Sequence, residues 1–116
     1  MQKTMKILVL GLSLLGVSGT LAQTASPEFQ LEVFRADGTP PATHRLSEGR
    51  QTVYEGNGWE CIMRSSSPRR GSIGCKHGDS IVRADAVCNN PNRSHAGLAV
   101  YDGETLLASF LLKCPE

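Results

Sequence analysis

Four cysteines in a chain of 116 residues constrain this sequence more than any other feature. They are Cys61, Cys75, Cys88 and Cys114, an even number with long gaps between them. A short chain with such a set is typical of exported domains held by disulfides, because the cytosol keeps thiols reduced. Zinc sites made of four thiolates usually contain closely spaced pairs, which this chain lacks. We therefore expect two disulfides.

The order in which the cysteines pair is open, because four cysteines allow three connectivities and sequence does not select among them. We prefer the sequential pairing, Cys61 with Cys75 and Cys88 with Cys114. In the chain-entropy model, closing a loop of about 15 residues contributes ~3 kcal/mol, and the longer second loop contributes slightly more. A domain this small buries only about 60–65% of its unfolded surface, so these cross-links matter for its stability.

The N-terminus has the layout of a secretory signal peptide, in which a charged segment precedes an apolar run and small residues. Lys3 and Lys6 come before the apolar run at 7–17, and Thr20 and Ala22 stand at the positions before a cleavage site. The run is too short for a transmembrane helix, which needs about 20 apolar residues, so we expect no membrane insertion after cleavage. We place the cut after residue 22, with residue 19 as the fallback.

The predicted organisation is therefore a signal peptide at 1–22, a short leader at 23–27 and a single β domain at 28–116. The mature protein is expected to be secreted or periplasmic. Loss of Lys3 and Lys6 changes the net charge from +1 to −1. This near-neutral balance argues against nucleic acid as a partner, since nucleic-acid binders carry a strong basic excess. Any charged partner has to be recognised by a local patch.

The C-terminal segment at 97–114 is the strongest β signal in the chain. Asp102 and Gly103 separate two apolar runs, and Asp-Gly is a frequent turn in two-residue hairpins. With these residues as the turn, Tyr101 lies opposite Glu104, and directly opposed residues share a face of the sheet. The expected core face is then Ala99, Tyr101, Leu106, Ala108, Phe110, Leu112 and Cys114.

Other segments also show the short alternating patterns of strands. They are 28–35, 51–55 and 59–64 around the turn Gly56-Asn57-Gly58, 72–76, and 81–88 with an apolar face that includes Val82. The segment 44–50 fits either a short strand or an extended connection, and 65–71 has the composition of a polar loop. About six to seven short strands with Gly, Pro and Asn turns and no helical period predict an all-β fold. We expect a small, disulfide-stapled antiparallel β-sandwich or open barrel, after a cleaved N-terminal signal helix.

The segment between Cys61 and Cys75 supplies the candidate partner-binding loop, Pro68, Arg69, Arg70 and Gly71. A disulfide-braced loop that presents arginine is suited to the acidic pocket of a trypsin-like protease or to an anionic surface, because bracing lowers the ordering cost of binding. The alternative is an ordinary solvated loop, in which these residue types are common.

Signals for catalysis are weak. His44, His77 and His95 lack the spacing of a metal site, and the His77-Gly78-Asp79 segment has the composition of a turn. The segment 71–74 contains Gly-Ser-Ile-Gly but has no strand-to-helix context for a nucleophile. We expect no catalytic residue, no metal and no cofactor. Asn92-Arg93-Ser94 matches the acceptor pattern for N-glycosylation.

These observations favour a small exported binding or interaction module, not an enzyme, and we expect a monomer whose partner is an extracellular or envelope protein. One alternative is a protease inhibitor that presents the Arg69-Arg70 loop. A second is a small secreted hydrolase, which requires two of His44, His77, Asp79 and His95 to lie near a serine.

Overall fold

The computed structural model describes residues 27–116; the expected signal peptide and residues 23–26 of the leader lie outside the described residues. Within the described range the chain is all-β, and no helix in it is long and apolar enough to cross a membrane. The eight strands are β1 (Phe29–Arg35), β2 (Ala42–Leu46), β3 (Gly49–Gly56), β4 (Trp59–Ser67), β5 (Arg70–His77), β6 (Ser80–Val87), β7 (His95–Asp102) and β8 (Thr105–Lys113).

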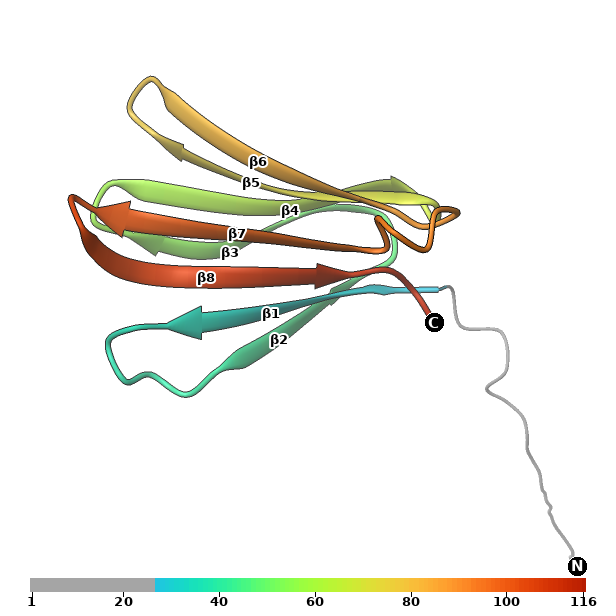
Figure 1. The fold of residues 1–116 in the computed structure, drawn as a ribbon, viewed down its shortest axis with the longest axis horizontal. Helices are drawn as coiled ribbons and strands as arrows, with labels where there is room; N and C mark the ends of the chain where they lie inside the picture. Colours follow the sequence, from blue (N-terminus) through green and yellow to red (C-terminus); the bar gives the residue numbers. More distant parts are fainter. Residues whose placement is uncertain (1–26) are drawn as a thin grey trace, which may run out of the picture.

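The strands form two antiparallel sheets, as Figure 1 shows. Sheet A has the order β2-β1-β8-β7 and sheet B the order β3-β4-β5-β6. Within each sheet the paired strands follow each other in sequence, except that β8 pairs with β1. The predicted antiparallel sandwich is confirmed. The structure has one strand more than the six to seven expected. This strand is β2, which overlaps the segment 44–50 that fits either a strand or a connection.

The core lies between the sheets and follows from alternation along each strand. In β1, Phe29, Leu31 and Val33 are fully buried, whereas Glu32 between them is exposed. Because successive side chains of a strand point to opposite faces, this pattern is the one expected of a half-buried strand. The other fully buried large side chains are Met63, Ile73, Leu112, Val100, Cys61 and Cys75.

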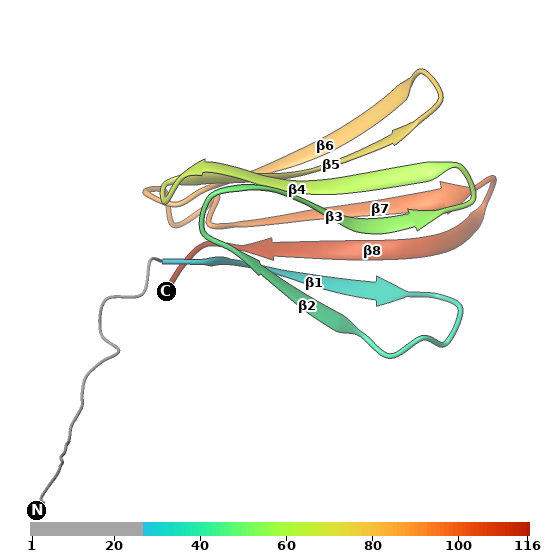
Figure 2. The same cartoon turned by 180° about the vertical axis from the view of Figure 1, so that it is seen from behind.

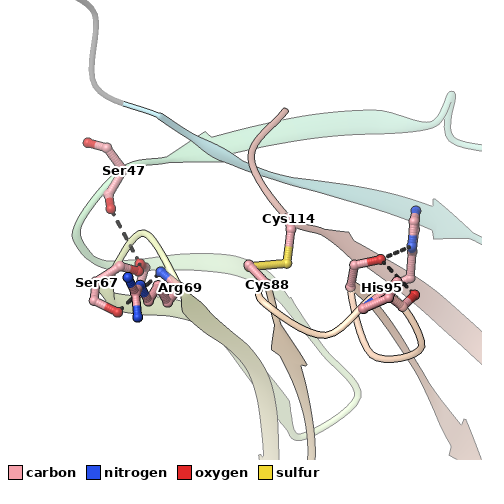
Figure 3. Close-up of a disulfide and its surroundings, with 9 residues drawn as sticks. Ser47, Ser67, Arg69, Cys88, His95 and Cys114 are labelled. Carbon is pink, nitrogen blue, oxygen red and sulfur yellow. Dashed lines mark hydrogen bonds between the residues drawn. A yellow bond between two sulfur atoms is a disulfide. The ribbon is translucent and has the colours of Figure 1, made fainter.

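Two disulfides occupy different places in this sandwich. Cys61 and Cys75 lie directly opposite each other in the β4–β5 pair, with Cα atoms 4.0 Å apart, and both are buried. Cys88 and Cys114 follow β6 and β8, so their bond joins sheet B to sheet A (Figure 3). The connectivity is the sequential one that we preferred. Two disulfides in one small domain indicate an oxidising compartment.

The β3–β4 turn uses the residues that the sequence predicts. Asn57 and Gly58 have φ values of 52° and 84°, the positive values that a type I′ turn requires at both central positions. The β7–β8 turn differs from the expectation. Asp102 pairs with Thr105, which makes Gly103 and Glu104 the central residues.

A register shift between Val100 and Tyr101 also corrects the predicted core face of β7. Val100 pairs with Ala108 and Tyr101 with Leu106, so Leu107 is the extra residue of a β-bulge. Val100 is consequently buried, and Tyr101, which was expected in the core, is half exposed. The prediction for β8 was correct at its inward residues Ala108, Phe110 and Leu112.

Candidate functional site

The candidate loop Pro68–Gly71 is not a long polar loop, and the expectation of a loop across 65–71 was wrong. Strand β4 continues to Ser67 and β5 begins at Arg70, so Pro68 and Arg69 alone form the turn. The buried Ser65 hydroxyl donates to the Ser67 carbonyl at 2.9 Å, which fixes the end of β4. The Arg69 carbonyl accepts from the Cys88 amide at 2.7 Å, so the turn is held against the second disulfide (Figure 3).

Gly71 has a structural role at the start of β5. It is buried against the ring of Phe29, and a Cβ atom built at Gly71 would lie 2.7 Å from that ring. Only glycine leaves the space that Phe29 needs. Arg70, which precedes Gly71, points to the opposite face and is exposed. Of the four candidate residues, Arg70 is therefore the one available to a ligand on the outer face of sheet B.

Alternation places most of the basic side chains of sheet B on this outer face. The outward residues are Arg50, Thr52 and Glu55 in β3, Glu60, Ile62, Arg64 and Ser66 in β4, Arg70, Ser72, Gly74 and Lys76 in β5, and Ile81, Arg83, Asp85 and Val87 in β6. Five of these are basic and three are acidic. The face is thus positive although the chain as a whole, with a formal net charge of +1, is nearly neutral.

The centre of this face is a depression that we call the arginine trough. Its walls are Arg50, Arg64, Arg70 and Arg83, and its floor is Ser72 and Gly74. Two adjoining cavities of about 390 and 430 Å³ make up the trough and share three of its four arginines. The depression exists because short side chains on β5 lie between long ones on β4 and β6.

Arg50 and Arg64 are directly opposed across the β3–β4 pair. Like charges in this relation destabilise a sheet, since directly opposed Cβ atoms are only about 4.5–5.5 Å apart. The two ion pairs among residues 27–116 are Arg83 with Asp85 and Lys113 with Glu32, each at 2.9 Å. Neither involves Arg50 or Arg64, so both guanidinium groups are available to an external anion.

The trough contains no aromatic side chain. Its polar lining comes from guanidinium groups, the ammonium group of Lys76, serine hydroxyls and one acidic residue, Glu60, with Ile62 and Ile81 at one end. The aromatic residues of sheet B, Tyr54 and Trp59, belong to the inner side, where they pack in or against the core. This composition suits recognition of charge and offers no platform on which a base could stack.

The three histidines lie on different strands. The Nδ1 atom of His44 in β2 lies 3.2 Å from Nε2 of Gln51. His77 at the end of β5 packs against Trp59, with ring centroids 5.1 Å apart. The Nδ1 atom of His95 at the start of β7 lies 3.2 Å from Oγ of Ser94. No hydrogen bond links Asp79 to any of them within 27–116. No group of three or more possible metal ligands occurs in the described part of the chain.

Two further features lie outside the trough. Asn92 of the glycosylation pattern is exposed in the β6–β7 loop, where its backbone amide donates to the side-chain oxygen of Asn90 at 3.0 Å. In the β1–β2 loop, hydrogen bonds from the side chain and backbone of Thr39 lower the pKa of Asp37.

No family model, no curated protein and no solved structure matches this chain. The site therefore has to be interpreted from its own chemistry. Sequence reasoning found Arg70 but missed Arg50, Arg64 and Arg83, which lie on three other strands. The signal that could have found them is the alternation of apolar and polar residues along each strand, because each of these arginines stands at an outward, polar position.

Proposed function

We propose that this protein is a non-enzymatic binding module of the extracellular or periplasmic compartment that holds an anionic ligand in the arginine trough. The observation that carries the proposal is the direct opposition of Arg50 and Arg64 without a carboxylate partner. An anion between these guanidinium groups removes their repulsion, so it stabilises an arrangement that the empty sheet disfavours.

The chemistry of the trough supports a ligand with phosphate, sulfate or carboxylate groups. Arginine binds such groups through two parallel hydrogen bonds, and four arginines around one floor suit a ligand with several anionic groups. The serine hydroxyl of Ser72 and the open backbone beside Gly74 allow polar groups of the ligand to approach the sheet. Recognition by exposed arginines is expected to weaken steeply with salt.

The geometry of the Arg69-Arg70 segment gives less support to the inhibitor alternative. Arg70, Gly71 and Ser72 pair with β4 on one side and with β6 on the other. Their backbone is thus already used in the sheet and is not extended from the surface toward a protease cleft.

Retention on a heparin column in a rising chloride gradient tests the proposal, with the mature protein as the sample. Wild type is expected to elute late, and R50Q/R64Q to elute at clearly lower salt. The matched control is R45Q/R93Q, which removes the same charge from exposed positions outside sheet B. A second matched pair is Arg70→Gln, in the trough, and Arg69→Gln, in the adjacent turn.

Equal loss of retention in R50Q/R64Q and in R45Q/R93Q would contradict the proposal, because the interaction would then depend on net charge alone. Circular dichroism of each variant establishes that the fold is intact.

A further inference from the structure

The first half of β6 is an uncovered edge of sheet B. Sheet B ends at β6, and Figures 1 and 2 show the β5–β6 hairpin diverging from β7 towards its turn. Ile81 is 70% exposed, and Val82, which the sequence predicted to face the core, is 36% exposed. The expectation for Val82 was wrong because sheet A does not extend over the end of the hairpin.

Two hydrogen bonds near the end of β6 show which backbone groups point away from β5. The amide of Cys88 donates to Arg69 at 2.7 Å, on the side of the β4–β5 turn, and the amide of Val87 donates to Arg93 at 2.8 Å, on the opposite side. Backbone groups alternate in direction along a strand. The odd-numbered residues of β6, which include Ile81, Arg83 and Asp85, therefore direct their amide and carbonyl groups to the free edge.

No backbone hydrogen bond within residues 27–116 reaches that edge at Ile81, Arg83 or Asp85, because β6 pairs only with β5. Native proteins usually protect such edges with charged side chains, proline, a bulge or a covering segment, and of these devices β6 carries only the charged pair Arg83 and Asp85. The β5–β6 register is regular from Arg70 with Val87 to His77 with Ser80, and β6 contains no proline. This edge is thus regular, partly apolar and open to a further strand.

We propose that β6 from Ile81 to Asp85 is a strand-addition site for an extended segment of a partner protein in which apolar and acidic residues alternate. Main-chain hydrogen bonds to the free edge supply affinity, and side chains at alternate positions supply specificity. The acidic residues of such a segment lie on the outer face, near Arg83, and its apolar residues lie on the opposite face, beside the partly exposed Val82. This inference rests on backbone groups at the edge of the sheet, and Ile81 and Arg83 are the residues that it shares with the lining of the arginine trough.

The experiment uses three synthetic fluorescein-labelled octapeptides: alternating Val and Glu, alternating Val and Lys, and the Val-Glu peptide with one central proline. Fluorescence anisotropy with the mature protein is expected to show binding of the Val-Glu peptide alone. On binding, amide hydrogen exchange is expected to slow at Ile81, Arg83 and Asp85, whereas Val82 and Ala84, whose amides already point to β5, are expected not to change.

Two substitutions at one position separate the backbone from the side chain. R83Q keeps the outward amide and loses the charge, so it is expected to weaken the binding of the peptide. R83P also removes the amide, and it is expected to abolish binding while the fold is kept, since proline is tolerated where an edge amide faces solvent. R50Q/R64Q is expected to bind the peptide as wild type does, although it loses retention on heparin.

The proposal is overturned if R83P binds the peptide as well as R83Q does, or if protection is absent from the three edge amides of the wild type. Self-association of the wild-type protein through β6, detected by sedimentation with the same amide protection, would also overturn it, because the edge would then be occupied by a second copy. The hydrogen-exchange result on the wild type decides the matter even if R83P does not fold.

Discussion

The ring of Phe29 in β1 lies against the backbone of Gly71 in β5, across the interface between the two sheets. We expect G71A to lower the free energy of unfolding by about 1–3 kcal/mol, the usual cost of adding a methyl group to a filled core. Urea denaturation followed by tryptophan fluorescence measures this change.

Gly74 in the same strand provides the control for G71A. A Cβ atom at Gly74 would meet its nearest neighbour, the carbonyl oxygen of Val82, at 3.9 Å, which is ordinary contact. G74A is therefore expected to be within about 0.5 kcal/mol of wild type, as surface substitutions usually are. A cost for G74A as large as that for G71A would show that β5 disfavours alanine for a reason unrelated to Phe29.

The two disulfides should differ in their access to reductant. Cys61 and Cys75 are buried in the β4–β5 pair, whereas Cys88 and Cys114 are half-buried at the end of the sandwich. Thiolate attack requires access to sulfur. In mild dithiothreitol under native conditions, we expect alkylation at Cys88 and Cys114 before any at Cys61 and Cys75. Peptide mass spectrometry over time measures the order, and simultaneous labelling of all four would contradict it.

Loss of the second disulfide should also lower stability. Cys88 and Cys114 are separated by 26 positions, and the chain-entropy model assigns about 3.5 kcal/mol to closing a loop of that length. C88S/C114S is expected to unfold at correspondingly lower urea. A loss well below ~2 kcal/mol would indicate that contacts between β6 and β7 hold this end of the sandwich without the cross-link.

Anions should stabilise the fold through the arginine trough. At equal ionic strength, phosphate or sulfate is expected to raise the melting temperature of the wild type more than chloride does. In R50Q/R64Q this difference between anions should shrink, because the opposed guanidinium groups are gone, and the melting temperature in chloride should equal or exceed that of wild type. If the difference in melting temperature between the anions is unchanged in the variant, the stabilisation comes from the general exclusion of these salts from the protein surface and not from binding in the trough. Differential scanning fluorimetry provides both measurements.

Trp59 connects the sheets by a single polar contact. Its Nε1 donates to the carbonyl of Tyr101 at 3.1 Å, from β4 to β7. W59F keeps an aromatic ring beside His77 and loses the donor, so we expect a loss of about 0.5–1.5 kcal/mol. Urea denaturation followed by far-ultraviolet circular dichroism measures it. W59F should leave heparin retention unchanged, because Trp59 does not line the trough.

Much of the fold was predictable because alternation and turn chemistry act locally. A few adjacent residues determine which side chains of β1 and β8 face the core, and they also determine the Asn57-Gly58 turn. The face of β7 did not, since a single extra residue at Leu107 shifts the pairing and such a bulge leaves no strong mark in the sequence. The segment 65–71 was misassigned because Ser65 is buried in a strand through hydrogen bonds, which composition does not reveal.

The candidate site was less predictable than the fold. Arg70 stood out because it lies beside Arg69, but its partners Arg50, Arg64 and Arg83 are distant in sequence. They meet only after three antiparallel registers are fixed, and each register depends on turn length. The exposure of Val82 likewise depends on where sheet A ends, which is a property of two sheets and not of one strand.

The pairing of β1 with β8 joins the two ends of the described fold. Every other ladder forms between consecutive strands, whereas β1 can complete its pairing only with β8, the last strand of the described fold. Until then β1 has only the short β2 beside it, and its other edge is unsatisfied. Sheet A is therefore complete only when β8 has paired with β1. Truncations that remove even part of β8 should yield chains that aggregate or are degraded.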